Sequence, residues 1–251
     1  MIFIIKTVGL MRFLFIFSIF IAFSISAEAR INNKNLEQSF SLIKQGKVDE
    51  AFSKLKQCSK ELERYNKERA VCQMMLGEMY LGQKKIDSAT AAFRENYLIN
   101  KKVAGKDSAI YGLSMSNMGR IRKIRGELGK AIINYRVGNR VLKKFVPKTN
   151  MNLAVNYKQL AEIYAIKKDF NKFTLNADNS LKYFKTNPQQ GLPMIAAISN
   201  SYSQILMANR QGKKAVNIMQ DAVNIMGKYL KADNAQLKQM QENLAKAKAS
   251  L

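Results

Sequence analysis

The sequence predicts an all-α protein, an α-solenoid of about five two-helix repeats, and two observations predict it. Helix-favouring Ala, Leu, Lys, Gln, Met and Ile dominate the 251 residues, whereas glycine and proline together make only 16 of them. The second observation is an internal repeat with a step of 42 residues. A chain of this length can form one core or one elongated array of repeats.

The first 29 residues differ from the rest and are predicted to be a secretory signal peptide. The uncharged apolar run 13–27 follows Lys6 and Arg12 and precedes the small residue Ala29, after which we expect cleavage. This run is shorter than the roughly twenty apolar residues of a membrane span, so an uncleaved anchor is the less favoured alternative. The sequence therefore predicts an exported protein, periplasmic or secreted, with no stable membrane span after cleavage.

Details of the leader leave two alternatives open. Translation starts at Met1 or at Met11, and Glu28 is the second candidate for the first residue of the mature chain. Lys6, Arg12 and Glu28 give residues 1–29 a net charge of +1, so the remaining chain carries +23. The basic character therefore belongs to the mature protein.

The repeat is defined by an apolar anchor followed by a small residue. Steps of 42 residues lead from Leu76 to Met118, Leu160 and Tyr202. The small residues that follow are Gly77, Gly119, Ala161 and Ser203. Thirteen residues after each anchor stand Ala89, Ala131, Phe173 and Ala215, and four further on Phe93, Tyr135, Ala177 and Met219. An earlier copy, at a step of 38, begins with Gln38, Ser39 and Leu42.

This pattern resembles the tetratricopeptide repeat (TPR) over about residues 33–230. Its 42-residue step resembles the long-helix subclass of kinesin light chains and bacterial peptide-sensing regulators. The resemblance implies helix-turn-helix units stacked in a right-handed superhelix, with the first helices lining a concave surface. Small residues allow the two helices of a unit to approach closely. Phe173, where the family has alanine, makes the fourth repeat the least regular.

The predicted organisation has three parts. They are the signal peptide 1–29, a TPR array 30–230 with repeats near 33–66, 70–104, 107–147, 150–187 and 193–230, and a capping helix 231–251. Asp107, Asn150 and Asp233 are the predicted helix N-caps. Pro147, Pro188 and Pro193 are predicted to lie between repeats.

The residue inventory argues against catalysis. Histidine is absent, so no imidazole base or ligand exists, and two cysteines cannot build a thiolate zinc site alone. The glycine-containing segment 126–130 lacks the spacing of a phosphate-binding loop. The sequence predicts a protein that is not an enzyme and has no cofactor and no metal.

Binding is the function that such an array supports, and its middle is predicted to be polar and basic. The predicted ligand-binding groove residues are Asn117, Arg120, Lys123, Lys158, Glu162, Asn200 and Gln204. In the TPR family asparagines hold an extended peptide by its backbone, and Arg or Lys suits a carboxylate. Exchange of Arg120 for Glu is predicted to weaken partner binding at least about tenfold with little effect on melting temperature. The alternative is that these basic residues belong to a generally basic surface.

Two kinds of partner fit these features. The first is an acidic or carboxylate-bearing protein or peptide, and the second is an anionic envelope polymer or lipid bound through a basic surface whose Lys and Arg are spread over all repeats. Export disfavours nucleic acid. A cytoplasmic peptide-sensing regulator is a third alternative, disfavoured by the signal peptide and by the lack of an effector domain.

Cys58 and Cys72 stand seven residues either side of Tyr65, where the first repeat is expected to turn into the second. They can face each other across this hairpin and form a disulfide in an oxidising compartment. The alternative, two small buried thiols, is equally compatible with the spacing.

Overall fold

The computed structural model describes residues 31–147 and 150–251, and their regular structure is entirely helical. The expected signal peptide lies outside the described residues. The helices are α2 (Lys34–Lys44), α3 (Val48–Glu61), α4 (Lys67–Gly82), α5 (Ile86–Val103), α6 (Ala109–Ile124), α7 (Leu128–Leu142), the short 3-10 helix η1 (Lys143–Phe145), α8 (Asn150–Ile166), α9 (Phe170–Phe184), α10 (Pro188–Ala208), α11 (Gly212–Gly227) and α12 (Ala235–Ala249).

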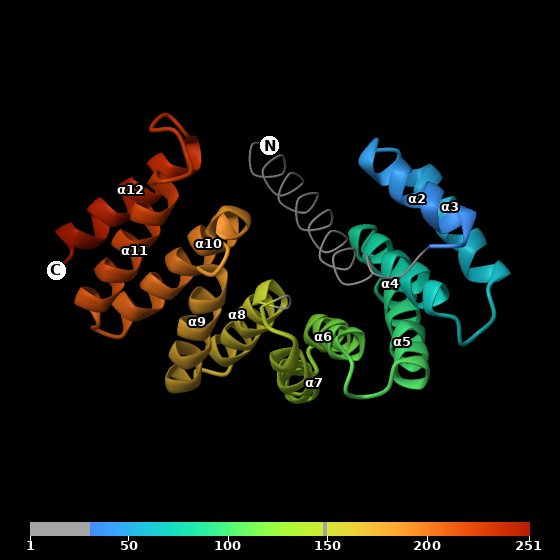
Figure 1. The fold of residues 1–251 in the computed structure, drawn as a ribbon. Helices are drawn as coiled ribbons and strands as arrows, with labels where there is room; N and C mark the ends of the chain where they lie inside the picture. Colours follow the sequence, from blue (N-terminus) through green and yellow to red (C-terminus); the bar gives the residue numbers. More distant parts are fainter. Residues whose placement is uncertain (1–30, 148–149) are drawn as a thin grey trace. The chain divides into compact units, whose positions relative to one another are not determined.

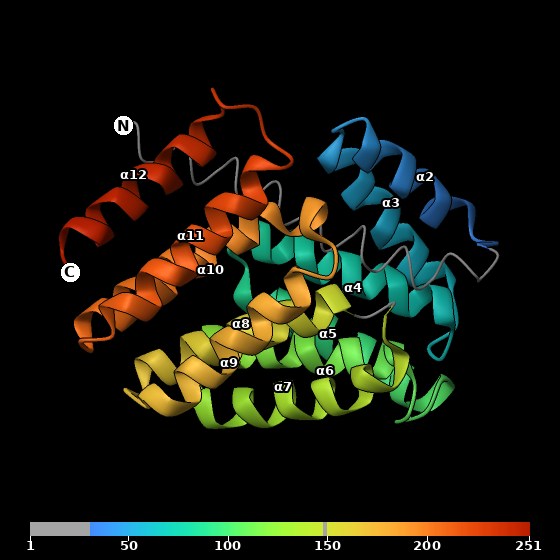
Figure 2. The same cartoon turned by 60° about the vertical axis from the view of Figure 1, so that its left-hand side comes forward.

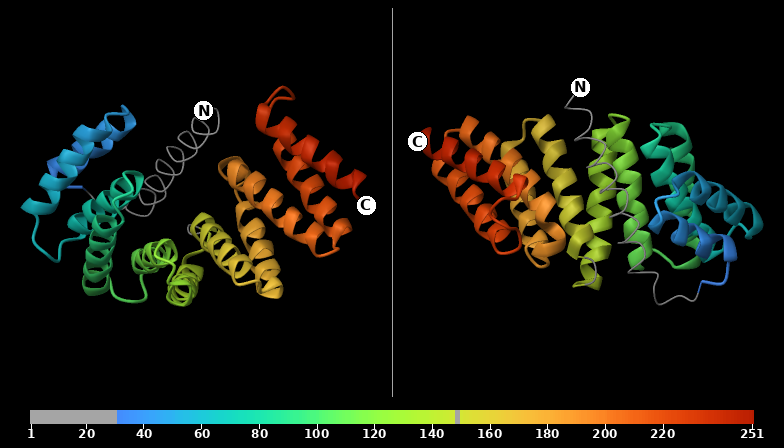
Figure 3. Two further views of the ribbon diagram at one scale, coloured as in Figure 1. Left: turned by 180° about the vertical axis from the view of Figure 1, so that it is seen from behind. Right: turned by 90° about the horizontal axis from the view of Figure 1, so that it is seen from above.

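The chain divides into two compact units between Thr149 and Asn150. The first unit holds the helix pairs α2–α3, α4–α5 and α6–α7, and the second holds α8–α9 and α10–α11 followed by α12 (Figure 1). Within the first unit α4 and α6 lie on one side, with α5 and α7 on the other (Figures 1 and 3). In the second unit α12 packs against α10 and α11. The predicted all-α repeat architecture is confirmed.

Close packing inside the α4–α5 and α6–α7 pairs of the first unit depends on glycine. A Cβ atom on Gly77 of α4 would lie 2.7 Å from Cε1 of Phe93 on α5. One on Gly119 of α6 would lie 3.1 Å from Cε1 of Tyr135 on α7. Both rings are buried, so the small residue after each anchor makes the space that the ring of the second helix fills.

In the fourth repeat the small and the large residue of the second helix exchange positions, which explains its irregular sequence. Phe173 stands where the neighbouring repeats have alanine, and Ala177 stands where the first unit has its buried rings. The ring of Phe173 meets that of Tyr202 on α10 edge to face, with centroids 5.3 Å apart. The large side chain has therefore moved one turn back along the second helix and packs on the next pair.

The turn inside each helix pair has the same backbone geometry. One residue in each turn has a positive φ angle: Gly46, Lys84, Gly126, Lys168 and Arg210. In the second turn the N–H of Lys85 donates to the carbonyl of Tyr80 at 2.9 Å, the bond that closes a Schellman motif, and the other four turns repeat it. A left-handed residue other than glycine costs about 1 kcal/mol or more. The repeat therefore imposes this turn even where no glycine relieves the strain.

Two of the predicted N-caps are wrong by one residue. The Ser108 hydroxyl caps α6 and accepts from the N–H of Tyr111, and Asn234 rather than Asp233 caps α12. Asp107 instead pairs with Lys144 at 2.7 Å, and this hydrogen bond holds the pKa of its carboxyl below the usual range. Asp, Asn and Ser cap helices about equally well, so the sequence could not choose between adjacent candidates.

The prediction that Pro193 lies between repeats is also wrong. Helix α10 begins at Pro188, and Pro193 lies inside it. Pro188 occupies the first helical position, where a missing N–H has no intrahelical partner to lose. Pro193 removes only one backbone hydrogen bond near the start of a helix whose buried face continues on both sides.

Candidate functional site

The predicted groove residues lie on three first helices of their pairs. Asn117, Arg120 and Lys123 are on α6 of the first unit, and Lys158 and Glu162 on α8 with Asn200 and Gln204 on α10 are in the second. Gln204 is exposed and the others are partly buried. Because the three helices belong to two units, a continuous groove along them stays a prediction.

Arg120 forms an ion pair with the first helix of the preceding repeat. Its Nη2 lies 2.5 Å from Oε1 of Glu78 on α4. The Glu78 side chain is only 8% exposed, whereas that of Arg120 is 28% exposed. The two residues are 42 positions apart, so the same site in two successive repeats holds opposite charges.

The guanidinium of Arg120 is also held by packing. It lies over the Phe93 ring, 5.4 Å from the centroid, and its Nε is buried without a hydrogen-bond partner among the described residues. Phe93 also fills the space beside Gly77. The charge at the predicted centre of the groove is therefore fixed on a rigid hydrophobic support.

This pairing corrects the expectation that Arg120→Glu leaves stability almost unchanged. The substitution would place a second carboxylate against buried Glu78 and leave both without a cation. Removing one partner of a fully buried pair costs roughly 3–5 kcal/mol, and the cost is smaller here because Arg120 is partly exposed. A lower melting temperature would then accompany any loss of binding. A useful variant has to change both members of the pair.

In the second unit the predicted groove residues pair locally. Lys158 forms an ion pair with Glu162 one turn later on α8. The Asn200 side chain accepts a hydrogen bond at 3.1 Å from Asn243 of α12, so the terminal helix reaches the α10 position that the sequence assigned to a ligand. Lys158 and Asn200 are thus oriented by side chains of their own unit.

Sequence reasoning missed a buried polar chain that joins three helices of the first unit. The Asn100 amide donates to the Ser114 hydroxyl at 2.9 Å, Ser114 donates to Asn96 at 2.8 Å, and the Asn96 amide donates to the carbonyl of Ala70 at 2.8 Å. Three polar residues on the buried faces of α5 and α6 were the signal that could have revealed it.

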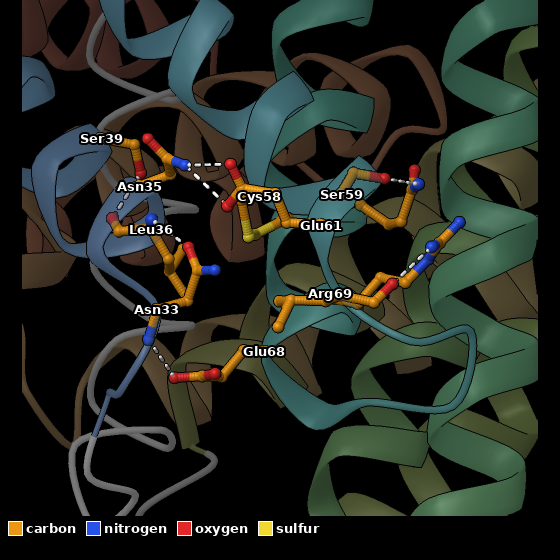
Figure 4. Close-up of a disulfide and its surroundings, with 12 residues drawn as sticks. Asn33, Asn35, Leu36, Ser39, Cys58, Ser59, Glu61, Glu68 and Arg69 are labelled. Carbon is orange, nitrogen blue, oxygen red and sulfur yellow. Dashed lines mark hydrogen bonds between the residues drawn. A yellow bond between two sulfur atoms is a disulfide. The ribbon is translucent and has the colours of Figure 1, made fainter.

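A disulfide joins Cys58 of α3 to Cys72 of α4, with Cα atoms 6.5 Å apart and both residues fully buried (Figure 4). Arg69 holds the intervening loop, because its Nη1 donates to the carbonyl of Leu62 and its Nε to Glu95 of α5. Glu68 accepts the N–H of Asn33, the N-cap of α2. Hydrogen bonds on both sides of the disulfide therefore fix the junction between the first two repeats.

Tyr202 is a buried titratable group of the second unit. Burial raises the pKa of its hydroxyl well above the usual range, and the neighbouring Asp178 carboxylate raises it further. The folded state therefore favours the neutral hydroxyl. The stability that follows is complete below the unfolded pKa of about 10 and is lost as the pH rises beyond it.

Replacement of Tyr202 by Phe should flatten this alkaline loss. Above pH 10 the free energy of unfolding of the parent protein should fall faster than that of Tyr202→Phe, by up to about 1.4 kcal/mol per pH unit. At pH 8 the variant should differ by less than about 1 kcal/mol, since the bond from the hydroxyl to the Thr174 carbonyl is long, at 3.4 Å. Urea unfolding between pH 8 and 11 measures both, and parallel curves would contradict the assignment.

Residues 31–147 and 150–251 contain no cluster of three or more Asp, Glu or Cys side chains placed to hold a metal ion. Within the same ranges, no helix has both the length and the apolar composition needed to cross a bilayer.

Comparison with solved structures shows the fold. The chain is similar to BtubC (BKLC) from P. vanneervenii, with 15% identity and a TM-score of 0.61 over 78% of this chain and 81% of BtubC. It is similar to the apo form of RapI, with 12% identity and a TM-score of 0.56 over 94% and 90% of the two chains. It is also similar to Acl4, the assembly chaperone of RpL4, with 8% identity and a TM-score of 0.52 over 86% of each chain.

No family model matches the sequence, and no curated protein matches it. At identities this low the structural likeness concerns the fold alone. The chain has a TPR-like helical-repeat fold, as the resemblance in its sequence predicted.

Proposed function

We propose that this helical-repeat chain is an exported, non-catalytic scaffold that binds an acidic or carboxylate-bearing segment of a partner protein. The binding surface is formed by the first helices of the repeats. The observation that carries the proposal is the environment of Arg120. An ion pair with buried Glu78 fixes its guanidinium, and yet over a quarter of the Arg120 side chain stays exposed and can contact a ligand.

The neighbours of Arg120 on α6 suit an extended acidic chain. Asn117 and Lys123 lie one turn before and after it on the same helix, and both are partly exposed. An amide can donate to and accept from a peptide backbone, and two cations one turn apart can contact successive carboxylates. Hydrogen bonds to charged groups contribute about 1.5–3 kcal/mol, against less than about 1 kcal/mol for a fully exposed ion pair.

One further observation supports a scaffold and another supports an oxidising compartment. Acl4, whose fold is similar, is the assembly chaperone of another protein, RpL4. The buried disulfide between Cys58 and Cys72 is a bond that persists outside the reducing cytosol.

N-terminal sequencing of the protein from a cell-envelope fraction tests export, for which Arg30 is the expected first residue and Glu28 the second candidate. A full-length chain retained in the inner membrane would contradict it.

Peptide binding tests the ligand class. A labelled decapeptide rich in Asp and Glu, with a free carboxyl terminus, should bind at least about tenfold tighter than its Asn and Gln counterpart with an amidated terminus. Fluorescence anisotropy measures both at about 0.15 M salt, where distant surface charges are largely screened. Equal affinities for the two peptides would reject a carboxylate-binding groove.

A further inference from the structure

The positive charge is concentrated in one repeat. Residues 107–147 hold nine Lys or Arg and two acidic residues, a net charge of +7, whereas each of the other four predicted repeats carries +2 or +3. Lys and Arg therefore occur in all five repeats, but the net charge is uneven. Much of the excess lies on α7 and η1, which contain no acidic residue.

Helix α7 presents this charge on its solvent side. Its buried residues face α6, while Ile133, Arg136 and Arg140 are exposed, and the row continues through Lys143 of η1. These positions are three or four residues apart, so they form one stripe along the helix. Helix α7 lies on the far side of α6 from α4, at the margin of the first unit (Figures 1 and 2). The stripe is thus separate from the α6 residues proposed to bind peptide.

Helix α5 repeats part of the stripe one repeat earlier. Arg94 and Lys101 stand 42 residues before Arg136 and Lys143, and all four are exposed. The nearby acid Glu95 is already bonded to Arg69. In the second unit the position equivalent to Arg136 is Asp178, so the stripe is not continued there.

Aliphatic side chains stand among these cations. Ile133 is 60% exposed on α7, and Leu98 is 38% exposed on α5. A soluble polyanion would gain little from them. A membrane surface offers both anionic head groups and an apolar boundary below them, so it matches basic and aliphatic residues on one face.

We propose that the outward faces of α5 and α7, here called the basic face, dock on an anionic phospholipid bilayer. Binding is peripheral: Arg94, Lys101, Arg136, Arg140 and Lys143 contact head groups, while Ile133 enters the interfacial region. A basic residue close to an anionic leaflet contributes about 1 kcal/mol, so five of them are sufficient for salt-sensitive, reversible attachment. The basic face and the α6 residues can then act independently, one on the membrane and one on a partner.

Vesicle binding by the protein purified from its producing cells tests this proposal. It should bind vesicles of about 30% phosphatidylglycerol in phosphatidylcholine and not pure phosphatidylcholine at about 0.15 M salt. Arg136→Glu with Arg140→Glu should weaken binding at least about tenfold. The control is Lys213→Glu with Lys228→Glu, in which an exposed residue of α11 and its exposed C-cap are reversed and the net charge changes equally. It should weaken binding less than about twofold. Equal losses, or no binding by the parent protein, would overturn the proposal.

An uncharged change separates lipid from other anions. Ile133→Ser should weaken vesicle binding about fivefold and leave binding to soluble polyglutamate unchanged. Ile133 is largely exposed, so the variant should keep the parent circular-dichroism spectrum and melting curve. Vesicle binding that is insensitive to Ile133, together with polyglutamate binding that needs Arg136 and Arg140, would reject the bilayer and make the basic face a polyanion site.

Discussion

Replacing Cys58 and Cys72 together by alanine should lower the free energy of unfolding of the first repeats by about 3 kcal/mol. The disulfide closes a loop with a sequence separation of 14, and in the chain-entropy model a loop of about 15 residues restricts the unfolded state by this amount. Both residues are fully buried, so the small cavities left by the sulfur atoms add to the loss.

The loss should be local, because each repeat of such an array contacts only its neighbours. Hydrogen exchange should accelerate in α2, α3 and α4 and stay unchanged in α11 and α12. Reductant should reproduce the effect in the parent protein and do nothing to the variant. The intact mass of the parent should increase by about two daltons on reduction. An unchanged mass and an unfolding curve indifferent to reductant would show that the two thiols are free in the purified protein.

Gly77→Leu should destabilise the second repeat by about 2–3 kcal/mol. Even a Cβ atom at this position lies within 2.9 Å of three atoms of the Phe93 ring, so a larger side chain forces apart two helices that carry the core. The intrinsic helix propensity of leucine exceeds that of glycine by under about 1 kcal/mol, which is too little to compensate.

Gly129→Leu is the matched control. Nothing lies within 4 Å of a Cβ atom at Gly129, which is exposed near the start of α7, so this variant should be neutral or slightly stabilised. Combining Gly77→Leu with Phe93→Ala should cost clearly less than the sum of the two single losses, because the ring that causes the clash is gone. Chemical denaturation of the four proteins measures the cycle, and additive losses would contradict direct packing of residue 77 on residue 93.

The fold could be predicted from the sequence because the same packing contacts recur in each copy of the sequence repeat. The small residues Gly77 and Gly119 and the rings of Phe93 and Tyr135 recur at fixed offsets, and each meets its partner as the spacing predicted. Gly46 and Gly126 lie with positive φ angles in two of the turns. Helix boundaries were harder to predict, because neighbouring polar residues are equivalent caps and because Pro193 lies inside α10 despite the hydrogen bond that it removes.

The sequence could predict only part of the candidate site. Glu78 and Arg120 stand 42 residues apart, so the repeat places them on successive first helices, but the periodicity does not tell whether such side chains point to a ligand or to each other. The choice depends on burial, and Glu78 is buried enough to need a cation. The sequence did not reveal the basic stripe of α7 for a different reason. Its residues have the same helical spacing as the buried residues of α7 but lie on the opposite face of the helix.

In the proposed function a fixed cation on α6, rather than the net charge of the chain, recognises the acidic partner. The most direct measurement is the affinity for the acidic decapeptide of the double variant Glu78→Gln, Arg120→Gln, which leaves the net charge unchanged and replaces the buried ion pair by two amides. The control is Asp87→Asn, Arg125→Gln, which neutralises an exposed pair with a nitrogen–oxygen distance of 3.0 Å in the same unit. The first variant should bind at least about tenfold more weakly, and the control should bind like the parent. Parent-like affinity in both, with folding intact, would show that the peptide is held by the overall electrostatic field and that Arg120 serves only to pair with Glu78.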